Sequence, residues 1–518
     1  MVLSTSGQTS DFHLFSSVGI VFSVGLLFTS IALYALGTGI YNIFFHPLRH
    51  LPGPFLARAS GFPYTFRMRD GTIIPWIQEL HAKYGDVVRV NPYEVSFISG
   101  ETAWEDIYGF RTGKQKNTGS FMKDRSWFPT PINGVYSIIV ADDVTHSRMR
   151  RNLAHAFSDK ALKAQEGMVQ QYADLLCHRL QEQKSEGVEA VDITRWYNYT
   201  TFDVITDLTF GEPLYCLRDN EYHPWVHMVF AAVMSIGLLA SRKRFPLFTY
   251  YDNLKGFFTD SSKTYRERAK FFALVQAKVA DRLEKDTDRP DFFHHVIKNM
   301  ESSEKALTTG EMESNAVVLM VAGSETTATL LSGVTYLLLK HPKIYAKVVH
   351  EVRSKFQKRN DITFEEASKL EYMIACLSEA LRYYPPVPTG FARSAPHPGG
   401  MVSGHFIPEN TSVYVSQHAT NHSPRNYTDP DSFVPERWLG DVRYKDDNRA
   451  ATQPFSFGPR NCLGKNLAYS EMRVILAKVL FTFDLELANK EQDWIAEHKC
   501  FTLWKKPDLM IKLHPVQR

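Results

Sequence analysis

One cysteine of the chain lies in a setting that suits metal binding better than catalysis by the thiol itself. Cys462 stands in the stretch Phe-Ser-Phe-Gly-Pro-Arg-Asn-Cys-Leu-Gly, residues 455–464, which contains no base that could activate a nucleophile. The glycines at 458 and 464 permit tight turns and the close approach of a flat ring, and N–H groups at the start of the following helix can hold a thiolate ionised. The stretch therefore predicts a soft-metal thiolate site. A buried structural cysteine and a hydrolytic nucleophile are the alternatives.

A second stretch, Ala-Gly-Ser-Glu-Thr-Thr at residues 322–327, interrupts the apolar middle of a long helix. A glycine inside a helix costs about 1 kcal/mol, and a buried carboxylate without a partner costs more. Glu325 is therefore either a surface residue in water or part of a locally opened helix. In the opened helix, small residues let a ligand approach the backbone, and the Thr326 hydroxyl bonds the carbonyl of Ala322. Glu325 and Thr326 would then supply protons.

Two further stretches carry charged residues at suggestive spacings. Glu379 and Arg382 are three positions apart and share one helix face, and Arg437 lies in a proline-punctuated loop. Most such pairs are exposed to solvent and contribute little to stability. If Arg437 meets Glu379 and Arg382, the three form a buried bidentate cluster that fixes the loop against the helix.

Helices and small sheets must position these residues. A capping box at residues 308–311 begins a long helix that stops before Pro342, and a further helix from residue 364 ends at Pro385. Residues 146–184 contain at least two helices. Alternating β-branched residues and turn signals predict strand pairs in residues 86–99, 402–416 and 500–513. The predicted fold class is mainly α with small β-sheets, in one large domain.

The N-terminal segment is apolar enough to cross a membrane. From Leu14 to Phe45 there is no Asp, Glu, Lys or Arg, and about 20 apolar residues span a bilayer. A cleaved signal peptide, the alternative, has a basic start and a shorter apolar stretch. Basic residues follow the span, so the body is expected on the cytoplasmic side. We predict a membrane anchor over residues 1–46, a proline-containing hinge over 47–54 and a catalytic domain over 55–518.

The bulk composition narrows the classes of function. A chain of 518 residues with 44% hydrophobic residues can bury a large core, and its net charge of +3 gives no indication of nucleic-acid binding. Five scattered cysteines do not describe a disulfide framework and fit a reducing compartment.

The four stretches together resemble the cytochrome P450 superfamily of haem-thiolate monooxygenases. Phe-x-x-Gly-x-Arg-x-Cys-x-Gly at 455–464 resembles its haem-binding loop, and Ala-Gly-x-Glu-Thr-Thr at 322–327 resembles its oxygen-activation helix. Glu-x-x-Arg at 379–382 with Pro-Glu-Arg-Trp at 435–438 resembles its structural triad. The similarity covers essentially the whole chain. It extends to fungal microsomal members of secondary metabolism, such as the isotrichodermin hydroxylase group.

The resemblance implies a role for each of these residues. Cys462 would be the proximal thiolate ligand of haem b, donating electron density that favours O–O cleavage. Thr326 would bond the bound O₂ and relay protons, and Glu325 would link it to solvent. The other haem-binding residues would be Arg460, Phe455 and Gly464 in the loop, with Arg150, His146 and Arg393 toward the propionates; many members have Trp where His146 stands. The structural triad would be Glu379, Arg382 and Arg437.

Substrate contacts follow from the same resemblance. The predicted contacts are Ala322, Gly323, Val387, Phe391 and Phe501, with residues 110–140 as a loop over the distal side of the haem. These regions are mostly apolar, which suits a lipophilic substrate that enters from the bilayer.

The implied activity is insertion of one oxygen atom of O₂ into a lipophilic small molecule, in fungal secondary metabolism, at the endoplasmic reticulum membrane. Electrons from NADPH would arrive through a separate NADPH–cytochrome P450 reductase, with cytochrome b5 as an optional partner, because the chain has no dinucleotide-binding glycine turn or flavin-sized domain. Two alternatives keep the haem: an isomerase or dehydratase that does not use O₂ and needs no proton relay, and a membrane-anchored haem sensor. The sequence identifies neither the substrate nor the position oxidised.

Overall fold

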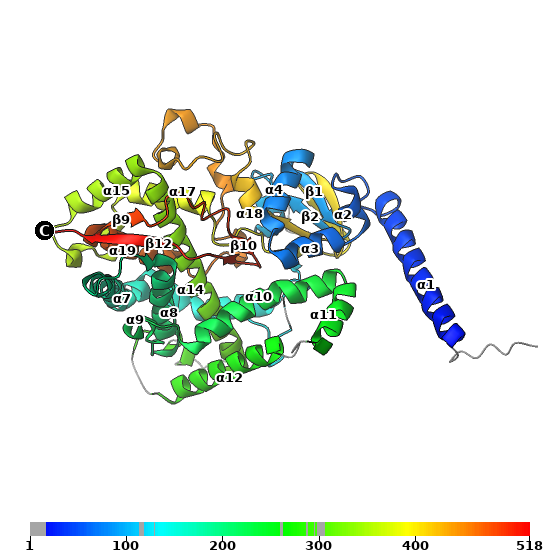
Figure 1. Cartoon of the computed structure of the whole chain (residues 1–518), viewed down its shortest axis with the longest axis horizontal. Coiled ribbons are helices and arrows are strands. Elements are labelled where there is room, and N and C mark those ends of the chain that lie inside the picture. Colours follow the sequence, from blue (N-terminus) through cyan, green and yellow to red (C-terminus); the bar gives the residue numbers. More distant parts are fainter. Residues whose placement is uncertain are drawn as a thin grey trace, which may run out of the picture.

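The computed structural model describes residues 17–112, 119–128, 130–258, 263–285, 289–294, 296–297 and 306–517. Its helices are α1 Ser17–Phe44, α2 Phe55–Ala59, α3 Phe62–Asp70, α4 Ile73–Tyr84, α5 Ala103–Tyr108, α6 Asp143–Ala154, α7 Asp159–Ser185, α8 Ile193–Phe210, α9 Cys216–Asp219, α10 Pro224–Arg244, α11 Leu247–Phe258, α12 Lys263–Glu284, α14 Thr309–Lys340, α15 Pro342–Lys355, α16 Phe364–Ala367, α17 Glu371–Tyr383, α18 Gln417–Asn421 and α19 Lys465–Thr482. Its strands are β1 Val87–Asn91, β2 Glu94–Phe97, β3 Met122–Lys123, β4 Val191–Asp192, β5 Arg393–Ser394, β6 Gly399–Val402, β7 His405–Pro408, β8 Ser412–Val415, β9 Phe483–Leu487, β10 Lys499–Cys500, β11 Trp504–Lys505 and β12 Met510–Pro515. The expected fold class, mainly helical with small sheets, is confirmed (Figure 1).

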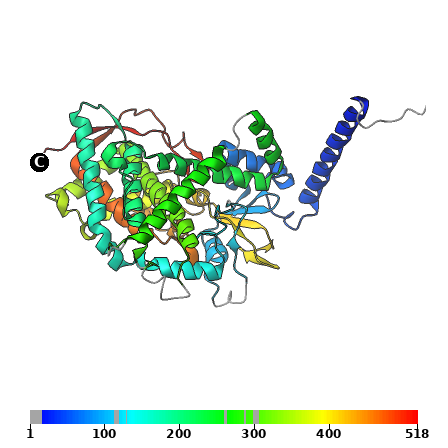
Figure 2. The ribbon, with the colours of Figure 1, turned by 90° about the horizontal axis from the view of Figure 1, so that it is seen from below.

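Helix α1 projects away from the rest of the protein in both views (Figures 1 and 2). Residues Gly19–Phe44 are long and apolar enough to cross a membrane, and their large apolar side chains are mostly exposed. Helices α10 and α14 also meet the length and composition requirements, but about half of each is buried inside the protein. Burial explains their apolar character, whereas α1 has no such explanation. The first 16 residues of the predicted anchor lie outside the described residues.

The segment after α1 is packed against the domain. Leu48 and Leu51 are buried in a core cluster with strands of the first sheet. The guanidinium of Arg89 on β1 is fully buried and donates to the Asn42 carbonyl of α1 at 2.8 Å and twice to the Pro92 carbonyl at 3.1 and 2.8 Å. The last turn of α1 is therefore held on the domain by a buried charged group.

Helix α14 runs through the centre of the domain (Figure 1). The predicted capping box is confirmed, since Thr308 Oγ1 accepts from Glu311 N at 3.2 Å and Glu311 Oε2 accepts from Thr308 N at 3.0 Å. Helix α8 packs along α14, and every residue of α8 except Arg195 is buried. A Cβ atom on Gly323 would lie 2.3 Å from Ile205 Cδ1 of α8, so this glycine allows the two helices to approach closely.

The first sheet has five strands in the order β1-β2-β8-β5-β3. Strands β1 and β2 form the hairpin predicted for residues 86–99, and β8 joins β2 in parallel. Strands β4, β12 and β9 form a three-stranded sheet near the C-terminus, while β6–β7 and β10–β11 are separate hairpins. The two helices expected within residues 146–184 are also present, as α6 and α7.

Two predictions about these elements were wrong. Residues 402–416 do not form one strand pair, because β7 pairs with β6 and β8 belongs to the first sheet. The helix expected from residue 364 to Pro385 is two helices, α16 and α17, separated by residues 368–370. In both cases tertiary partners decide the outcome, and local propensity carries no information about them.

Substitution of Gly333 by alanine should destabilise the protein. Its Cβ atom would lie 2.2 Å from Tyr384 Cδ1, and the Tyr384 ring is fixed between Trp494 and Trp504. Overpacking at such a site costs about 1–3 kcal/mol and outweighs the gain of about 1 kcal/mol in helix propensity. Thermal unfolding of Gly333→Ala and of Gly167→Ala, in α7 with open space around it, would measure the difference. A higher melting temperature for both variants would contradict the clash.

Candidate functional site

The cysteine loop is shaped by one glycine that no other residue could replace. Gly458 has φ +73°, and a Cβ atom there would lie 1.9 Å from the Tyr108 carbonyl oxygen. The chain then passes through a short 3₁₀ turn, Gly458–Arg460, and Cys462 N donates to the Phe455 carbonyl at 2.8 Å. Gly464 precedes α19, and a Cβ there would touch only Phe157, at 3.7 Å. Gly458 thus sets the loop's turn, and Gly464 leaves space beside the sulfur.

The Cys462 side chain faces a cavity deep inside the protein, so it is accessible and yet remote from bulk water. Burial raises the pKa of the Cys462 thiol, and the Gly464 backbone N–H and the charges of Arg150 and Lys465 act in the opposite direction. The other described cysteines are buried. Cys462 is therefore the thiol that a ligand in this cavity would meet.

The cavity lies between the cysteine loop and α14. It has about 1490 Å³ of space free of protein atoms, part of it open to solvent. On one side it is lined by Phe455, Cys462, Leu463 and Gly464. On the other side it is lined by Ala322, Gly323, Thr326 and Thr327 of α14. The cysteine and the threonine of the two motifs, 136 positions apart in the sequence, thus border one space.

Basic side chains gather along one edge of this cavity. Arg460 donates to the Ala141 carbonyl at 2.8 Å and pairs with the exposed Asp143, but its Nη1 is buried without a partner among the described residues. Arg150 donates to the Asn461 backbone and side-chain oxygens at 2.7 and 2.6 Å. His146 also lines the cavity, and burial together with Arg460 and Arg150 lowers its pKa to about 4.

Arg393 lies behind this edge rather than on the cavity wall. Its Nη1 donates to the Phe121 carbonyl at 3.4 Å, while Nε is buried without a partner among the described residues. Burial lowers the pKa of Arg393 to about 10. The predicted propionate contact through Arg393 therefore remains a proposal.

Sequence reasoning missed Lys123, which lies on β3 and lines the cavity beside these bases. Its pKa is well below the ordinary value, chiefly through burial and further through the charges of Arg393 and Arg460. Its ammonium group lies 4.4 Å from the centre of the Phe391 ring. Lys123 belongs to no recognisable sequence motif. Its place at the cavity becomes apparent only from the position of strand β3 in the structure.

These residues fit a flat dianionic group that carries a soft metal. Buried cations and unpartnered guanidinium N–H groups are costly unless an anion compensates them. Arg460 and Arg393 together exceed the charge that Asp143 can offset, and an anion beside Lys123 would favour its charged form. The two propionates of haem would supply the missing anions, and Cys462 on the cavity wall would be the thiolate for the iron.

Helix α14 presents its two motif residues to different surroundings. Thr326 lines the cavity, and its hydroxyl donates to the Ala322 carbonyl at 2.6 Å, the bond expected from the sequence. Glu325 is buried and does not line the cavity among the described residues; its Oε2 accepts from Lys506 Nζ at 3.0 Å. The surface alternative for Glu325 is therefore wrong. Gly323 lines the cavity and also contacts α8. The absence of a side chain there leaves room in the cavity and allows the two helices to pack closely.

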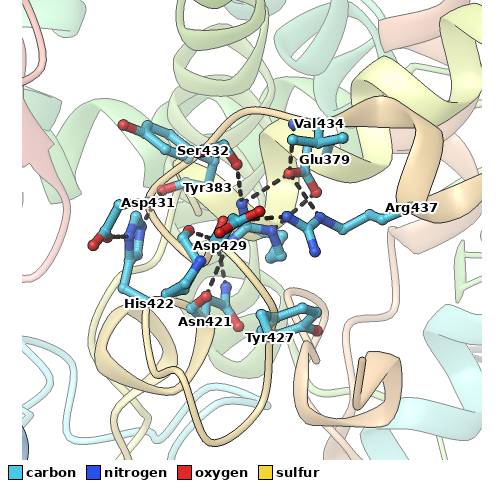
Figure 3. A network of polar contacts seen from close by, with 12 residues as sticks. Glu379, Tyr383, Asn421, His422, Tyr427, Asp429, Asp431, Ser432, Val434 and Arg437 are labelled. Atoms are coloured by element: carbon cyan, nitrogen blue, oxygen red, sulfur yellow. Dashed lines mark hydrogen bonds and ion pairs between the residues drawn. The ribbon is translucent and has the colours of Figure 1, made fainter. Parts of the chain in front are cut away.

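The structure brings Glu379, Arg382 and Arg437 into one cluster, and all three side chains are fully buried. Figure 3 shows Glu379 and Arg437 within it. Glu379 accepts from Arg382 Nε and Nη2 at 2.9 and 2.8 Å and from Arg437 Nε at 3.0 Å. Trp438 Nε1 and Val434 N donate to the same carboxylate at 2.8 and 2.9 Å. Three of the five donors, from Val434, Arg437 and Trp438, thus fix the loop of residues 434–438 against α17.

The predicted substrate residues divide into two groups. Ala322, Gly323, Val387 and Phe391 line the cavity. Phe501 is not among its described lining residues. It lies in the tip of the β10–β11 hairpin, against Gly71, which follows α3, and Gly237 of α10. In the loop expected over the cavity, Ile138 and Ile139 line it, while residues 113–118 and 129 lie outside the described residues.

Further lining residues had no signal in the sequence. They come from helices α8, α14 and α19 and from the end of α17, and include Ile205, Asn315, Leu330, Leu381 and Glu471. Burial raises the pKa of Glu471 to about 8. The polar atoms of the Asn315 side chain are hydrogen-bonded within the protein. Oδ1 accepts from Ile138 N at 2.8 Å, and Nδ2 donates to the Glu311 carbonyl at 2.8 Å.

Comparison with known proteins agrees with this geometry. The family model described as Cytochrome P450 matches residues 63–513. The chain is 46% identical to cytochrome P450 monooxygenase lcsI of Purpureocillium lilacinum, covering 99% of each chain. It is 47% identical to cytochrome P450 monooxygenase traB of Penicillium crustosum, covering 95% of this chain and 97% of the relative. It is 41% identical to the trichothecene C-15 hydroxylase of Fusarium sporotrichioides, over 93% and 96%.

Replacement of Arg437 by leucine should destabilise the domain. It leaves the Glu379 carboxylate buried with fewer donors, and breaking a buried ion pair from one side costs about 3–5 kcal/mol. Arg443→Leu is the matched control, because Arg443 lies six residues away, exposed, and pairs only locally with Asp441. Chemical unfolding of the two variants would measure the difference. Equal stability of the two would show that the cluster does not hold the loop.

Proposed function

The chain belongs to the cytochrome P450 family of monooxygenases, and from this premise we propose that it inserts one oxygen atom of O₂ into a lipophilic small molecule. The observation that supports this most directly is the shared cavity, which Cys462 borders from the loop and Thr326 from α14. A thiol alone would fit many sites. A cavity bordered by a thiol, by a hydroxyl and by buried cations fits a haem. The thiol would bind the iron, the cations would pair with the propionates, and the hydroxyl would supply protons.

The residues of this chain would hold the haem in two ways. Cys462 would bind the iron and donate electron density to it. Arg460, Arg150, Lys123 and His146 would face the propionates, with Arg393 adding positive charge from behind. When bound, the haem supplies the iron at which O₂ is activated with electrons that originate from NADPH. The apolar walls exclude water, which strengthens every charge interaction at the edge.

Thr326 would hold and move protons on the other side of the cavity. Its hydroxyl donates to the Ala322 carbonyl, so its lone pairs and, after rotation, its proton are available to the space beside it. Glu325, the next residue along the helix, would exchange protons with Thr326. General acid–base groups of this kind typically contribute about 10²–10⁴-fold to a rate.

The substrate would be lipophilic, because most of the cavity wall above the cysteine loop is apolar and the polar atoms of Asn315 are engaged within the protein. A hydroxylation is the simplest outcome. The relatives come from fungi, and one of them is named as a trichothecene hydroxylase. We therefore place the reaction in the oxidation of a fungal secondary metabolite.

The domain organisation and partners follow from the same premise. Residues 1–46 would anchor the chain in the endoplasmic reticulum membrane by one pass, residues 47–54 would join the anchor to the domain, and residues 55–518 would form the cytoplasmic catalytic domain. A separate NADPH–cytochrome P450 reductase, with cytochrome b5 as an optional donor, would dock on the cysteine side. A groove lined by Arg150, Arg151 and Lys465 runs beside the cysteine loop there and suits an acidic partner.

Cys462→Ser should abolish thiolate binding to haem. A serine hydroxyl is not ionised near neutral pH and is a poor ligand for this iron, whereas the rest of the cavity is unchanged. The absorption spectrum of the reduced carbon-monoxide complex reads this directly, because its Soret band depends on the thiolate. Cys376→Ser, at a buried cysteine of α17, should keep the band. A retained band in Cys462→Ser would exclude this residue as the ligand.

Thr326→Ala should keep the haem but divert electrons from product to hydrogen peroxide, because the cavity loses its proton-relaying hydroxyl. The comparison is NADPH-dependent O₂ uptake against peroxide release, in membranes with the reductase. Ser332→Ala is the matched control, since its hydroxyl makes the same bond to the carbonyl four residues back, at 2.7 Å, and is buried away from the cavity. Unchanged peroxide release would remove Thr326 from the relay, and absence of any O₂ uptake in the parent would favour an isomerase or dehydratase.

A further inference from the structure

A buried ion pair joins the C-terminal segment to α14 beside the candidate relay. Lys506, just after β11, donates from Nζ to Glu325 Oε2 at 3.0 Å and to Thr329 Oγ1 at 2.8 Å. Glu325 and Thr329 are four positions apart, so both acceptors lie on one face of α14. The two charged side chains are only 6% and 4% exposed. No motif in the sequence pointed to Lys506.

The pair lies beside the cavity, just outside its described lining. Val318 and Ala322 line the cavity, and Glu325 and Thr329 continue the same stripe of α14 but are buried. The Glu325 carboxylate is therefore buried at the border of the cavity, next to the turn that carries Thr326.

The charges of the pair act on three described neighbours, Tyr222, Tyr384 and His498. Burial raises the pKa of the Tyr222 and Tyr384 hydroxyls, and the Glu325 charge raises both further, so both are neutral. The pKa of His498 is lowered to about 4, chiefly by burial and partly by Lys506, so it is neutral near pH 7. Lys506 is therefore the cation that compensates Glu325.

Three buried polar atoms around the pair have no partner among the described residues. They are Glu325 Oε1, Tyr384 Oη and Asn198 Oδ1. Asn198 Nδ2 donates to Tyr222 Oη at 3.3 Å. This bond connects Asn198 to the pair, because the Glu325 charge raises the pKa of Tyr222. Buried polar atoms are nearly always satisfied by protein or by water. Oε1 is thus the carboxylate oxygen that Lys506 leaves without a partner among the described residues.

We propose that Lys506 is a positioning residue for the reaction, whose ammonium group fixes the Glu325 carboxylate beside the Thr326 turn and keeps it ionised, so that Glu325 can regain and release protons. This inference rests on the proposed function, because it concerns the protons that Glu325 and Thr326 would supply to the same reaction. A relay group must be able to both accept and release a proton. A carboxyl that is buried without a counter-ion takes up a proton and keeps it, which ends its use as a relay.

The test compares five variants of the full chain with its haem, and one of them is Glu325→Gln alone. Lys506→Met removes the ammonium group and keeps the length of the side chain, and Lys506→Arg keeps the charge. Lys505→Met is the matched control, because Lys505 is the adjacent residue and is exposed. Lys506→Met with Glu325→Gln removes both members of the pair, so that no uncompensated buried charge remains even if the single variant folds poorly.

The first readout needs no turnover. Infrared spectra of the purified protein should show a new protonated-carboxyl band in Lys506→Met, which is absent from Lys505→Met, Lys506→Arg and the double variant. The second readout is the fraction of NADPH-dependent O₂ uptake that ends as hydrogen peroxide. It should rise several-fold in Lys506→Met, less than the ~100-fold that loss of a proton-transfer group can cost, and return toward the parent value in Lys506→Arg.

The double variant separates action through Glu325 from a general loss of structure. If Lys506 acts through Glu325, the double variant should release the same fraction of peroxide as Glu325→Gln alone. The inference is overturned if Lys506→Met shows no carboxyl band, or if it melts at a lower temperature while its peroxide fraction equals that of Lys505→Met. The proposed function is judged separately by the thiolate-dependent Soret band of the parent, which these outcomes leave untouched.

Discussion

The carboxylate of Glu379 is the constraint on which the geometry of the cysteine side depends. It is fully buried and accepts from five donors, three of them in the loop at 434–438, so displacement of this loop would leave the buried carboxylate with Arg382 alone. Arg382 extends the cluster to the carbonyls of Asn421, Pro430 and Ser432 (Figure 3). Asp447 continues it by pairing with Arg437, and Trp104 fixes the next residues by donating to the Ala451 carbonyl at 2.9 Å. The residues that precede the cysteine loop are therefore held in position by these contacts.

Features encoded by neighbouring residues could be predicted from the sequence. The cysteine loop, the capping box of α14, the hairpin of β1 and β2 and the Thr326 bond to Ala322 all follow from residues fewer than a dozen positions apart. The apolar helix α1 was equally clear, because its composition alone distinguishes it. Long-range matches to a family pattern placed Glu379 and Arg437, whose contact spans 58 positions.

Features that depend on distant partners could not be predicted. Lys123 reaches the cavity because β3 pairs with β5, 270 positions later, and Ile205 does so because α8 packs along α14. The Glu325–Lys506 pair spans 181 positions and involves a lysine in an ordinary sequence context. The predicted pairing of the strands within residues 402–416 was wrong for the same reason. Strands β7 and β8 are adjacent in sequence but belong to different sheets. Local propensity describes which residues form an element and not which element it meets.

The buried Arg89 has a consequence for how the molecule would move. Because its guanidinium donates to the Asn42 carbonyl and the residues after α1 pack into the core, the helix would leave the domain as a rigid arm rather than on a loose tether. An arm of this kind embedded in lipid would transmit its tilt to the whole body. The enzyme would then keep one attitude to the lipid plane while it diffuses laterally, and would not tumble about its attachment point.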